Sequence, residues 1–299
     1  MPAIAEHFGD LLTAGFRKIF EDQFNLIPSM LPDLYNMQSS DKPEEKDSAV
    51  GGFGDFNTFE GTISYDEVYQ QYDKVYTPSE FAKGFKVQRR LFDDDLYNIM
   101  NKKPMGLAIA ARRTREKAGS AIFNNAFTTE GSGYSGDGTE LCASDHPSNT
   151  PGVATQSNEG TTALSATAVE TARTAMADFR DFEGEKISVI PDLILVPRAL
   201  EQTAWEIISS RGKVETANNN ANFHFGKYKL AVWDYLTDAN NWFMIDSALK
   251  DMFLLWFDRI PLEMGRDKDF DTYLAKFSAY MRYSNGFSDW RWLYGMLVS

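Results

Sequence analysis

The stretch DDDLYNIMNKKPMGLAIAARRTREKAGSAI, residues 93–122, carries the strongest helical signal in the chain. Apolar or small residues recur at three- and four-residue spacing from Leu96 through Leu107 to Ile122, as in an amphipathic helix. Three aspartates stand at its start, where negative charge suits the helix dipole. Pro104 predicts a kink or the beginning of a second segment. A helix of about 30 residues is a rod of roughly 45 Å, and compact globular domains seldom need one so long.

Two runs that precede this helix alternate between apolar and polar residues with a period of two, as β-strands do. They are residues 59–69 and 81–91, and Tyr76-Thr77-Pro78-Ser79 separates them. We therefore expect two long antiparallel strands connected near Pro78. Because a two-stranded ribbon is marginally stable alone, its apolar face must lie on the body of the chain or on a neighbouring molecule. The side chains taken as candidate contacts are Phe59, Ile63, Tyr65, Tyr69, Phe81 and Phe85.

The segments that flank the ribbon and the helix show no comparable periodicity. Residues 4–24 allow one or two helical turns, which Pro28 and Pro32 stop. Residues 38–52 are polar and charged, as in a linker, so the N-terminal region predicts an extended arm. Residues 128–162 are rich in Gly, Ser, Thr and Asn and predict a long surface loop.

Beyond that loop the sequence predicts a mixed α/β block and then a terminal sheet. Ser165 is a candidate N-cap for a helix over residues 167–179, and Pro197 opens a helix after the apolar run 193–196. The remaining expected elements are a loop at 211–222, strands at 228–233 and 242–245, and a largely strand-forming region at 253–298 with turns at 265–268 and 284–286.

Composition excludes several classes of protein. The chain of 299 residues has 30 basic and 43 acidic side chains, a net charge of −13, which disfavours a sequence-reading DNA binder because phosphate contacts supply most nucleic-acid affinity. Charged residues near the N-terminus break any signal-peptide pattern, and the longest apolar run, Met252–Phe257, is far shorter than a membrane span. The single cysteine, Cys142, forms no intrachain disulfide and fits a reducing cytoplasm.

The aromatic content is high, with 22 Phe, 13 Tyr and 6 Trp. Either the core is rich in rings or some rings are held for contacts between chains, where aromatic residues are enriched.

The residues that carry chemistry do not form a specific catalytic or metal-binding pattern. Cys142, Asp145 and His146 lie close in sequence, but one such trio in a Gly/Ser-rich loop is weak support for a zinc site. His146 as a base for a Cys142 nucleophile is disfavoured by the nearby acids, because a reactive thiolate needs electropositive surroundings. No phosphate-binding loop or nucleophile elbow is present. We therefore expect no catalytic residue, metal or cofactor.

One segment departs from the acidic average. Residues 102–117 contain one acidic side chain, Glu116, and six basic ones. This is either a solvated helix face or a docking surface for an acidic partner, a neighbouring subunit or non-specifically held nucleic acid. The basic residues are Lys102, Lys103, Arg112, Arg113, Arg115 and Lys117.

Three stretches carry a resemblance to a known family. They are GDGTELCASDHP at residues 136–147, PDLILVP at 191–197 and DWRWLYG at 289–295. In this order and spacing the chain resembles the major capsid proteins of tailed bacteriophages, which have the Hong Kong 97-like capsid fold, and it is most similar to the Mu-type major head subunits.

The resemblance implies an α+β fold with an N-terminal arm, an extended β-hairpin loop, a long spine helix, and peripheral and axial domains. The implied divisions are an arm at 1–48, an extended loop at 49–92, a peripheral domain with spine helix and surface loop at 93–162, an axial domain at 163–254 and a peripheral C-terminal sheet at 255–299.

The implied function is that of a non-catalytic shell subunit of the virion, assembled in the host cytoplasm into hexamers and pentamers around double-stranded DNA. The implied partners are further copies of the chain, a portal and decoration proteins, and a separate scaffolding protein, since no fused scaffold segment is expected before the arm. The basic cluster becomes a candidate surface that faces scaffold or DNA. Some relatives cross-link a lysine of the extended loop to a neighbour. Candidate lysines here are Lys74, Lys83 and Lys86.

Two rival functions stay open at this point. A cellular encapsulin-like compartment of the same fold would enclose protein cargo, and a peptide-binding groove would favour it. A cytosolic hydrolase centred on Cys142 and His146 would lose an activity on thiol labelling.

Overall fold

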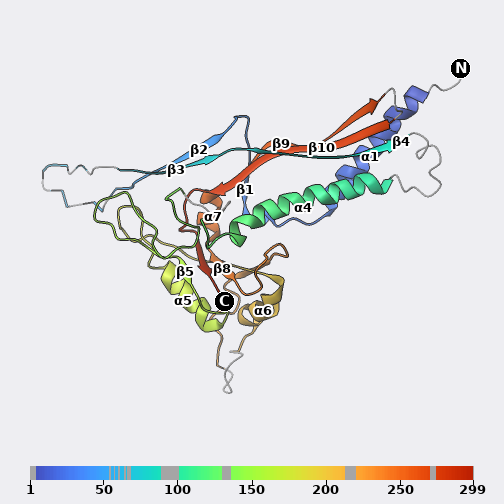
Figure 1. The fold of residues 1–299 in the computed structure, drawn as a ribbon. Helices are drawn as coiled ribbons and strands as arrows, with labels where there is room; N and C mark the ends of the chain where they lie inside the picture. Colours follow the sequence, from blue (N-terminus) through green and yellow to red (C-terminus); the bar gives the residue numbers. More distant parts are fainter. Residues whose placement is uncertain are drawn as a thin grey trace.

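The computed structural model describes residues 5–53, 55–56, 58–59, 61–63, 65, 69–88, 101–129, 136–212, 220–269 and 274–298, with side chains from residue 15 onward. The molecule is elongated (Figure 1). A long sheet and a long helix run side by side, a β-hairpin projects to one side, and an α/β block lies below them.

The long helix, α4 (Lys102–Asn124), confirms the strongest sequence prediction over its described length of 23 residues, about 35 Å. Pro104 lies in its first turn, where backbone N–H groups have no partner within the helix, so the proline is tolerated near the start of α4 and does not kink it. The predicted segment 93–100 lies outside the described residues.

The long sheet has the strand order β1-β9-β10-β4. Its strands are β1 (Asn36–Ser39), β9 (Leu254–Asp269), β10 (Leu274–Phe287) and β4 (Ser79–Gln88), with β1 parallel to β9 and the other pairs antiparallel. Helices α1 (Ala5–Leu26) and α4 pack against one another beside this sheet. Phe16 of α1 meets Phe277 edge-on at 5.3 Å, and Phe20 is buried in a cluster with Leu107 and Ala279.

The expected ribbon is paired differently from the prediction. β3 (Gln70–Tyr76) pairs with β2 (Glu45–Val50), and β4 pairs with β10 over its whole length. The predicted pairing of residues 59–69 with 81–91 is therefore wrong; residues 89–91 lie outside the described part. The projecting hairpin consists of β2, β3 and the connecting residues 51–69, which we call the hairpin tip.

The N-terminal region is more than an arm. Within the stretch expected to be a linker lie the end of β1 and all of β2, and the short helix α2 (Leu31–Leu34) is buried in the main core. The buried carboxylate of Glu116 on α4 accepts hydrogen bonds from Ser29 Oγ and Trp233 Nε1, so the N-terminal segment, the spine helix and the α/β block meet at one side chain. Gly119 is required here, since a side chain on it would collide with Leu31.

The α/β block contains a five-stranded sheet of order β5-β11-β8-β6-β7. The strands are β5 (Glu159–Gly160), β11 (Leu293–Met296), β8 (Trp242–Ile245), β6 (Leu193–Val196) and β7 (Lys229–Val232). The helices around it are α5 (Ala166–Met176), η3 (Arg198–Leu200), α6 (Glu201–Ser209) and α7 (Ser247–Phe253). Ser165 caps α5 as predicted, because its Oγ accepts a hydrogen bond from Ala168 N at 3.1 Å.

Two expectations for the C-terminal region are corrected, and one helix is new. The predicted turns at 265–268 and 284–286 lie inside β9 and β10. β11 pairs with β8 of the block, so the last strand belongs to that sheet and not to the peripheral one. Helix α7 was not anticipated; Asp246 caps it by accepting from the backbone N–H groups of Ala248 and Leu249.

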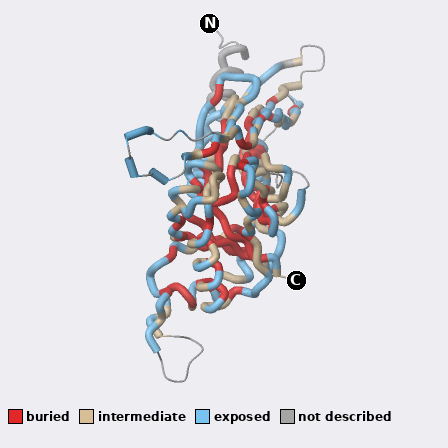
Figure 2. Tube along the Cα trace, turned by 90° about the vertical axis from the view of Figure 1, so that its left-hand side faces the viewer, coloured by how far each residue is buried: buried red, intermediate tan, exposed pale blue. Residues whose placement is uncertain are grey.

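The main core joins the spine helix to the block. Phe123 near the end of α4 meets Trp233, Phe243 and Trp292 edge-on, with ring centroids 5.5 to 6.0 Å apart. Figure 2 shows the buried residues gathered through the middle of the body, whereas the described part of the hairpin tip is exposed. The block and α4 thus share one core, whereas Phe53, Phe56, Phe59, Ile63 and Tyr65 of the tip are exposed.

Candidate assembly surfaces

The hairpin tip carries an unusual density of exposed apolar side chains. Phe53 and Phe59 are each 71% exposed, Phe56 is fully exposed, Ile63 is 64% exposed and Tyr65 88%. Contiguous exposed apolar groups of this kind mark interaction sites. The tip also contains four acidic residues and no basic one. Phe53 and Phe56 were missed because the predicted strand began at Phe59; the signal was the recurrence of phenylalanine every three residues from 53 to 59.

The six predicted ribbon contacts separate into two groups. Phe59, Ile63 and Tyr65 are exposed on the tip. Phe81 stacks on Tyr283 at 4.6 Å and Phe85 on Phe277 at 5.1 Å, so β10 of the same chain covers these two rings. Both rings are half-buried against the sheet of their own chain, and their role as subunit contacts stays a prediction.

Tyr69, the remaining predicted contact, is half-buried beside the first strand of the hairpin, where its carbonyl accepts a hydrogen bond from Gly51 N.

The basic cluster of α4 also separates into two groups. Lys102, Lys103, Arg113 and Lys117 are exposed. Because an α-helix turns roughly 100° per residue, they lie within about 100° of each other around the axis of α4. We call these four residues the outward basic face.

The other two basic residues serve the chain itself. Arg112 donates to the carbonyl of Phe24 on α1 at 2.8 Å and lies 3.8 Å over that ring. Arg115 is buried and forms a two-point ion pair with Asp258 of β9 at 2.8 and 2.9 Å. These contacts replace the predicted exposure to scaffold or DNA, because both guanidinium groups find acceptors within the fold.

Residues 136–162 are not a surface excursion, since several of their side chains enter the core. His146 is buried against Trp290 at 4.3 Å, its Nδ1 lies 2.7 Å from an Asp137 oxygen, and its Nε2 lies 3.1 Å from Asn158 Oδ1. Asn158 Nδ2 donates to the carbonyls of Leu141 and Leu293, which orients its oxygen toward the imidazole. The predicted loop histidine is therefore a structural one.

Cys142 is fully buried, and burial, followed by the charges of Glu159 and Glu140, raises the pKa of its thiol well above the usual value. A neutral, inaccessible thiol is a poor nucleophile, and both nitrogens of His146 face other partners. Among the described residues, no group of three or more His, Cys, Asp or Glu side chains is placed to hold a metal ion. None of the described helices combines the length and the apolar character needed to cross a membrane.

The candidate lysines for a cross-link lie in different settings. Burial lowers the pKa of the Lys74 ammonium, which lies 5.4 Å over the ring of Phe287. Lys83 and Lys86 are exposed on β4 and, being three residues apart on a strand, point to opposite faces of the sheet. Nothing in the described part of the chain selects a partner asparagine.

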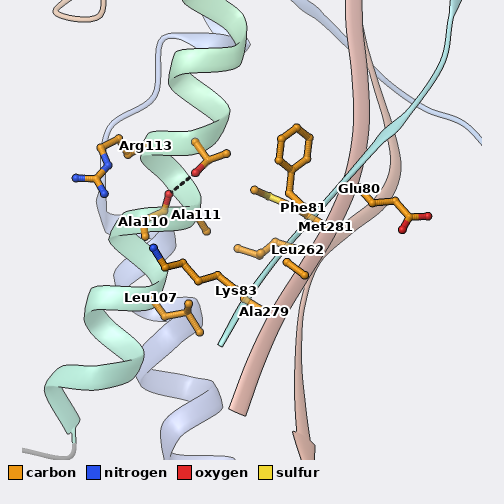
Figure 3. A pocket seen from close by; sticks show the side chains of 12 residues that line it. Glu80, Phe81, Lys83, Leu107, Ala110, Ala111, Arg113, Leu262, Ala279 and Met281 are labelled. Atoms are coloured by element: carbon orange, nitrogen blue, oxygen red, sulfur yellow. Dashed lines mark hydrogen bonds between the residues drawn. The ribbon is translucent and has the colours of Figure 1, made fainter. Parts of the chain in front are cut away.

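A cavity of about 280 Å³ opens between α4 and the strands β4, β9 and β10. Its lining is mixed and includes the apolar side chains of Phe81, Leu107, Leu262 and Met281. Figure 3 shows Lys83 extending from β4 toward α4 across this space. Charged residues at its rim are Lys83, Arg113 and Glu80. We call it the helix–strand cavity.

Solved structures from phages and a virus-like particle have the same fold. The chain is similar to a chain of the bacteriophage JBD30 capsid decorated with minor capsid protein trimers, with a TM-score of 0.58 and 14% identity over 71% of this chain and 92% of that one. It is similar to a Microbacterium phage Oxtober96 chain, with a TM-score of 0.56 and 9% identity over 91% and 92%. A virus-like particle from Pyrococcus furiosus also matches, with a TM-score of 0.55 and 10% identity over 95% and 98%.

Sequence comparison gives the family. No curated protein matches the chain significantly, but the family model described as phage capsid protein matches residues 71–295. The expected Hong Kong 97-like α+β fold is confirmed, whereas the narrower likeness to Mu-type subunits stays a prediction. Since the match covers three quarters of the chain, including the spine helix and most strands of both sheets, the chain belongs to the phage capsid protein family.

Proposed function

We propose that this major capsid protein builds its shell from hexamers and pentamers around double-stranded DNA, with the hairpin of each copy lying on the next copy. The observation that carries this proposal is the hairpin tip at the end of a projecting element, where Phe53, Phe56, Phe59, Ile63 and Tyr65 are each 64% exposed or more. Such side chains lose their contact with water only when a second molecule covers them.

The expected mechanism is geometric. A projecting element that docks on a different surface of the next copy makes a heterologous contact, which closes into a ring when the rotation allows it. Each contact is modest, and linking several contacts in one assembly raises the overall affinity far above that of one contact. No bond-making chemistry is required, so the subunit works without catalysis.

The outward basic face is the part we assign to the lumen. The side-chain ammonium groups of Lys102, Lys103 and Lys117 make no hydrogen bond or ion pair within the described residues, while the chain as a whole is acidic. Exposed lysines attract an acidic scaffold during assembly or DNA afterwards through a Coulombic interaction that salt weakens. Scaffold, portal and decoration proteins are the further partners, in the virion and during assembly in the host cytoplasm.

A protein compartment is the second candidate, and the match to the Pyrococcus furiosus virus-like particle favours it. The fold is common to both classes of particle, so it does not separate them. The family match to phage capsid proteins supports the phage head as the first choice.

Electron microscopy of the purified chain, alone and with the proteins encoded beside its gene, tests shell formation. We expect rings or closed shells, and particles that fill with DNA when the packaging proteins are present. Dispersed monomers under every condition contradict the proposal, and shells that fill with a protein and never with DNA support the compartment.

Replacing residues 52–68 by a short Gly/Ser turn tests the role of the tip. The replacement must spare β3 and β4, because both strands are paired in the folded subunit. The expected product is a folded monomer that forms no shell. The matched control changes Thr58 and Thr62, exposed polar residues of the tip, to alanine and should assemble. Normal shells from the replacement exclude the proposed contact.

A further inference from the structure

His146 is a buried histidine whose two ring nitrogens each lie against an acceptor. We infer that its ring carries both protons and a positive charge, and that this charge fixes residues 136–158 between the base of the hairpin and the C-terminal strand β11. We call these residues the linking segment. A proton-sensitive connection of this kind belongs to the folded subunit, and it goes beyond the proposed function because it does not depend on assembly.

The acceptor at His146 Nε2 is the side-chain oxygen of Asn158, at 3.1 Å. The amide of Asn158 has one possible orientation, because its Nδ2 donates to the carbonyls of Leu141 and Leu293 at 2.8 and 3.2 Å. Its Oδ1 also accepts from Ala143 N at 2.9 Å. Exchanging the amide nitrogen and oxygen would lose all three bonds in a fully buried site. Since the amide oxygen has no proton to give, Nε2 is the donor.

The acceptor at His146 Nδ1 is the carboxylate of Asp137. Nδ1 lies 2.7 Å from Asp137 Oδ2, and atoms so close need a proton between them. Thr139 Oγ1, 3.0 Å from Nδ1, donates its own proton to Asp137 Oδ1 at 2.8 Å, so it offers Nδ1 a second acceptor. Burial opposes ionisation of Asp137, but the hydrogen bonds from His146 and Thr139 outweigh it and hold the pKa of this carboxyl below its ordinary value. The proton between the two groups therefore lies on the histidine.

Burial makes the partners of this charge necessary. The side chains of His146 and Asp137 are 0% and 6% exposed, and an unpaired charge in such a place is strongly destabilising. The imidazole also stacks on Trp290 at 4.3 Å, with 11° between the ring planes, and the face of an aromatic ring attracts a cation. The other charged or titratable groups beside this network are Tyr72 and Lys74 of β3, near Asp137, and Arg291 with its partner Asp289, near Trp290.

The linking segment joins two parts of the molecule that are far apart in sequence. At the base of the hairpin, Gln71 Nε2 donates to Thr150 Oγ1, and Asn149 N donates to Gln71 Oε1, both at 3.1 Å. At the end of the segment, the carbonyl of Asn158 accepts from Gly295 N of β11 at 2.9 Å. The imidazole binds side chains at both ends of the segment, so loss of one ring proton weakens the connection between the hairpin and β11.

A higher pH removes one of the two ring protons and leaves a nitrogen lone pair against an acceptor. Because both acceptors are buried, water does not replace the lost hydrogen bond. The stability that the connection contributes is therefore present at neutral pH, where His146 is charged and Asp137 ionised, and is lost as the pH rises. In acid it persists below the usual range of a carboxyl, because the pKa of Asp137 is lowered.

Nitrogen NMR of the full-length subunit tests the charge directly, and His224 is the internal control. His224 Nε2 lies 3.0 Å from the carbonyl of Ala166, its Nδ1 has no partner among the described residues, and burial lowers the pKa of this imidazole. At about pH 7 we expect two protonated nitrogens in His146 and one in His224, with signals assigned from His7→Gln and His224→Gln. An unprotonated nitrogen in His146 at this pH overturns the inference.

Asp137→Asn supplies the second measurement. The oxygen of an asparagine here can accept from Thr139, and its amide nitrogen can donate to an unprotonated Nδ1, so that a neutral His146 satisfies both neighbours. We therefore expect one unprotonated nitrogen in His146 of this variant. Between about pH 7 and pH 10, the Tm of the parent should fall by about 3 °C more than that of the variant.

Hydrogen exchange locates the change. As the pH rises, protection of the backbone N–H groups of Asn149 and Gly295, corrected for the intrinsic exchange rate, should fall in the parent and not in Asp137→Asn. The matched control is Asp145→Asn, since Asp145 is an exposed acid of the same segment, and it should keep the pH dependence of the parent. Equal pH dependence of Tm and of protection in Asp137→Asn and the parent contradicts the inference.

Discussion

Two regions of the molecule are rich in aromatic residues and use them in opposite ways. Along β10 and its neighbours the rings stack on one another: Phe85 on Phe277, Phe81 on Tyr283, and Tyr283 on Trp256 at 4.6 Å. In the hairpin tip the rings of Phe53, Phe56 and Phe59 are 71% exposed or more. The same residue type therefore stabilises the folded subunit in one region and is available for a second molecule in the other.

Mutations should therefore affect the folding of the subunit and the assembly of the shell separately. Substitutions in the stacked region should lower the free energy of unfolding of the subunit. Substitutions in the tip should leave that quantity unchanged and reduce shell yield.

The largest effect is expected for Phe123→Ala. Phe123 is 2% exposed and contacts three other rings, so its removal should cost about 3–5 kcal/mol through lost transfer energy and a cavity. Denaturant unfolding of the soluble subunit measures this, with Phe59→Ala as the control. If the two variants lose equal free energy of unfolding, the proposed difference between stacked and exposed rings is wrong.

Asp258→Ala should cost about 3 kcal/mol, because it leaves the buried Arg115 guanidinium without its two-point partner. Lys117→Ala, an exposed residue of the same helix, is the control and should stay within about 0.5 kcal/mol. Replacing the pair together, by Arg115→Met with Asp258→Leu, should recover much of the loss. If the double variant has a lower free energy of unfolding than Asp258→Ala, Arg115 stabilises the fold by contacts other than this ion pair.

A smaller effect, about 1 kcal/mol, is expected for Ser165→Ala, since it removes the side chain that accepts from Ala168 N at the start of α5. The control is Thr167→Ala, because Thr167 is an exposed residue of the same helical turn. Thermal unfolding of the subunit compares the two. Shell yield should not change in either variant, because this cap is remote in sequence and in contacts from the hairpin tip.

Phe56→Ala with Phe59→Ala should change the free energy of unfolding by less than about 0.5 kcal/mol, because both rings are exposed in the subunit. Shell yield, counted by sedimentation and microscopy, should nevertheless fall sharply. Thr58→Ala between them is the control. A large loss of subunit stability in the phenylalanine variant would mean that the tip packs on its own chain.

The reactivity of the Cys142 thiol should distinguish the folded subunit from the unfolded chain. Burial raises the pKa of Cys142, so the thiol stays neutral above its usual pH range in the folded subunit. Labelling by a maleimide at pH 8 should therefore be slow in the native chain and fast after unfolding. Rapid labelling of native shells would contradict the buried position.

The local elements of this fold are well predicted by sequence. The described part of α4 follows its apolar spacing, α5 begins after its serine cap, and the apolar run Leu193–Val196 is the buried strand β6. These features depend on interactions between residues close in the chain, which a single sequence displays directly. Three short motifs also gave the capsid family, which the family match then confirmed.

The candidate surfaces were predicted in part. Phe59, Ile63 and Tyr65 are exposed as a subunit contact requires, whereas Phe81 and Phe85 are covered by β10. The sequence pattern does not distinguish the two groups. A strand that alternates apolar and polar residues has the same pattern whether it pairs with its own chain or with another chain. The outward basic face likewise depends on tertiary contacts, because Arg112 contacts Phe24 and Arg115 contacts Asp258, and neither belongs to that face.

What the sequence determined by itself was the helix, the cap, the buried strand and the family. What only the tertiary structure decided was which strands pair and which side chains the pairing covers: β4 joins β10, β3 joins β2, and β11 joins the sheet of the α/β block. Strand pairing joins residues far apart in the chain, and its free energy comes from packing against the partner, so a strand's own residues do not name that partner. For the same reason the helix–strand cavity, built from α4, β4, β9 and β10, has no counterpart in any one stretch of sequence.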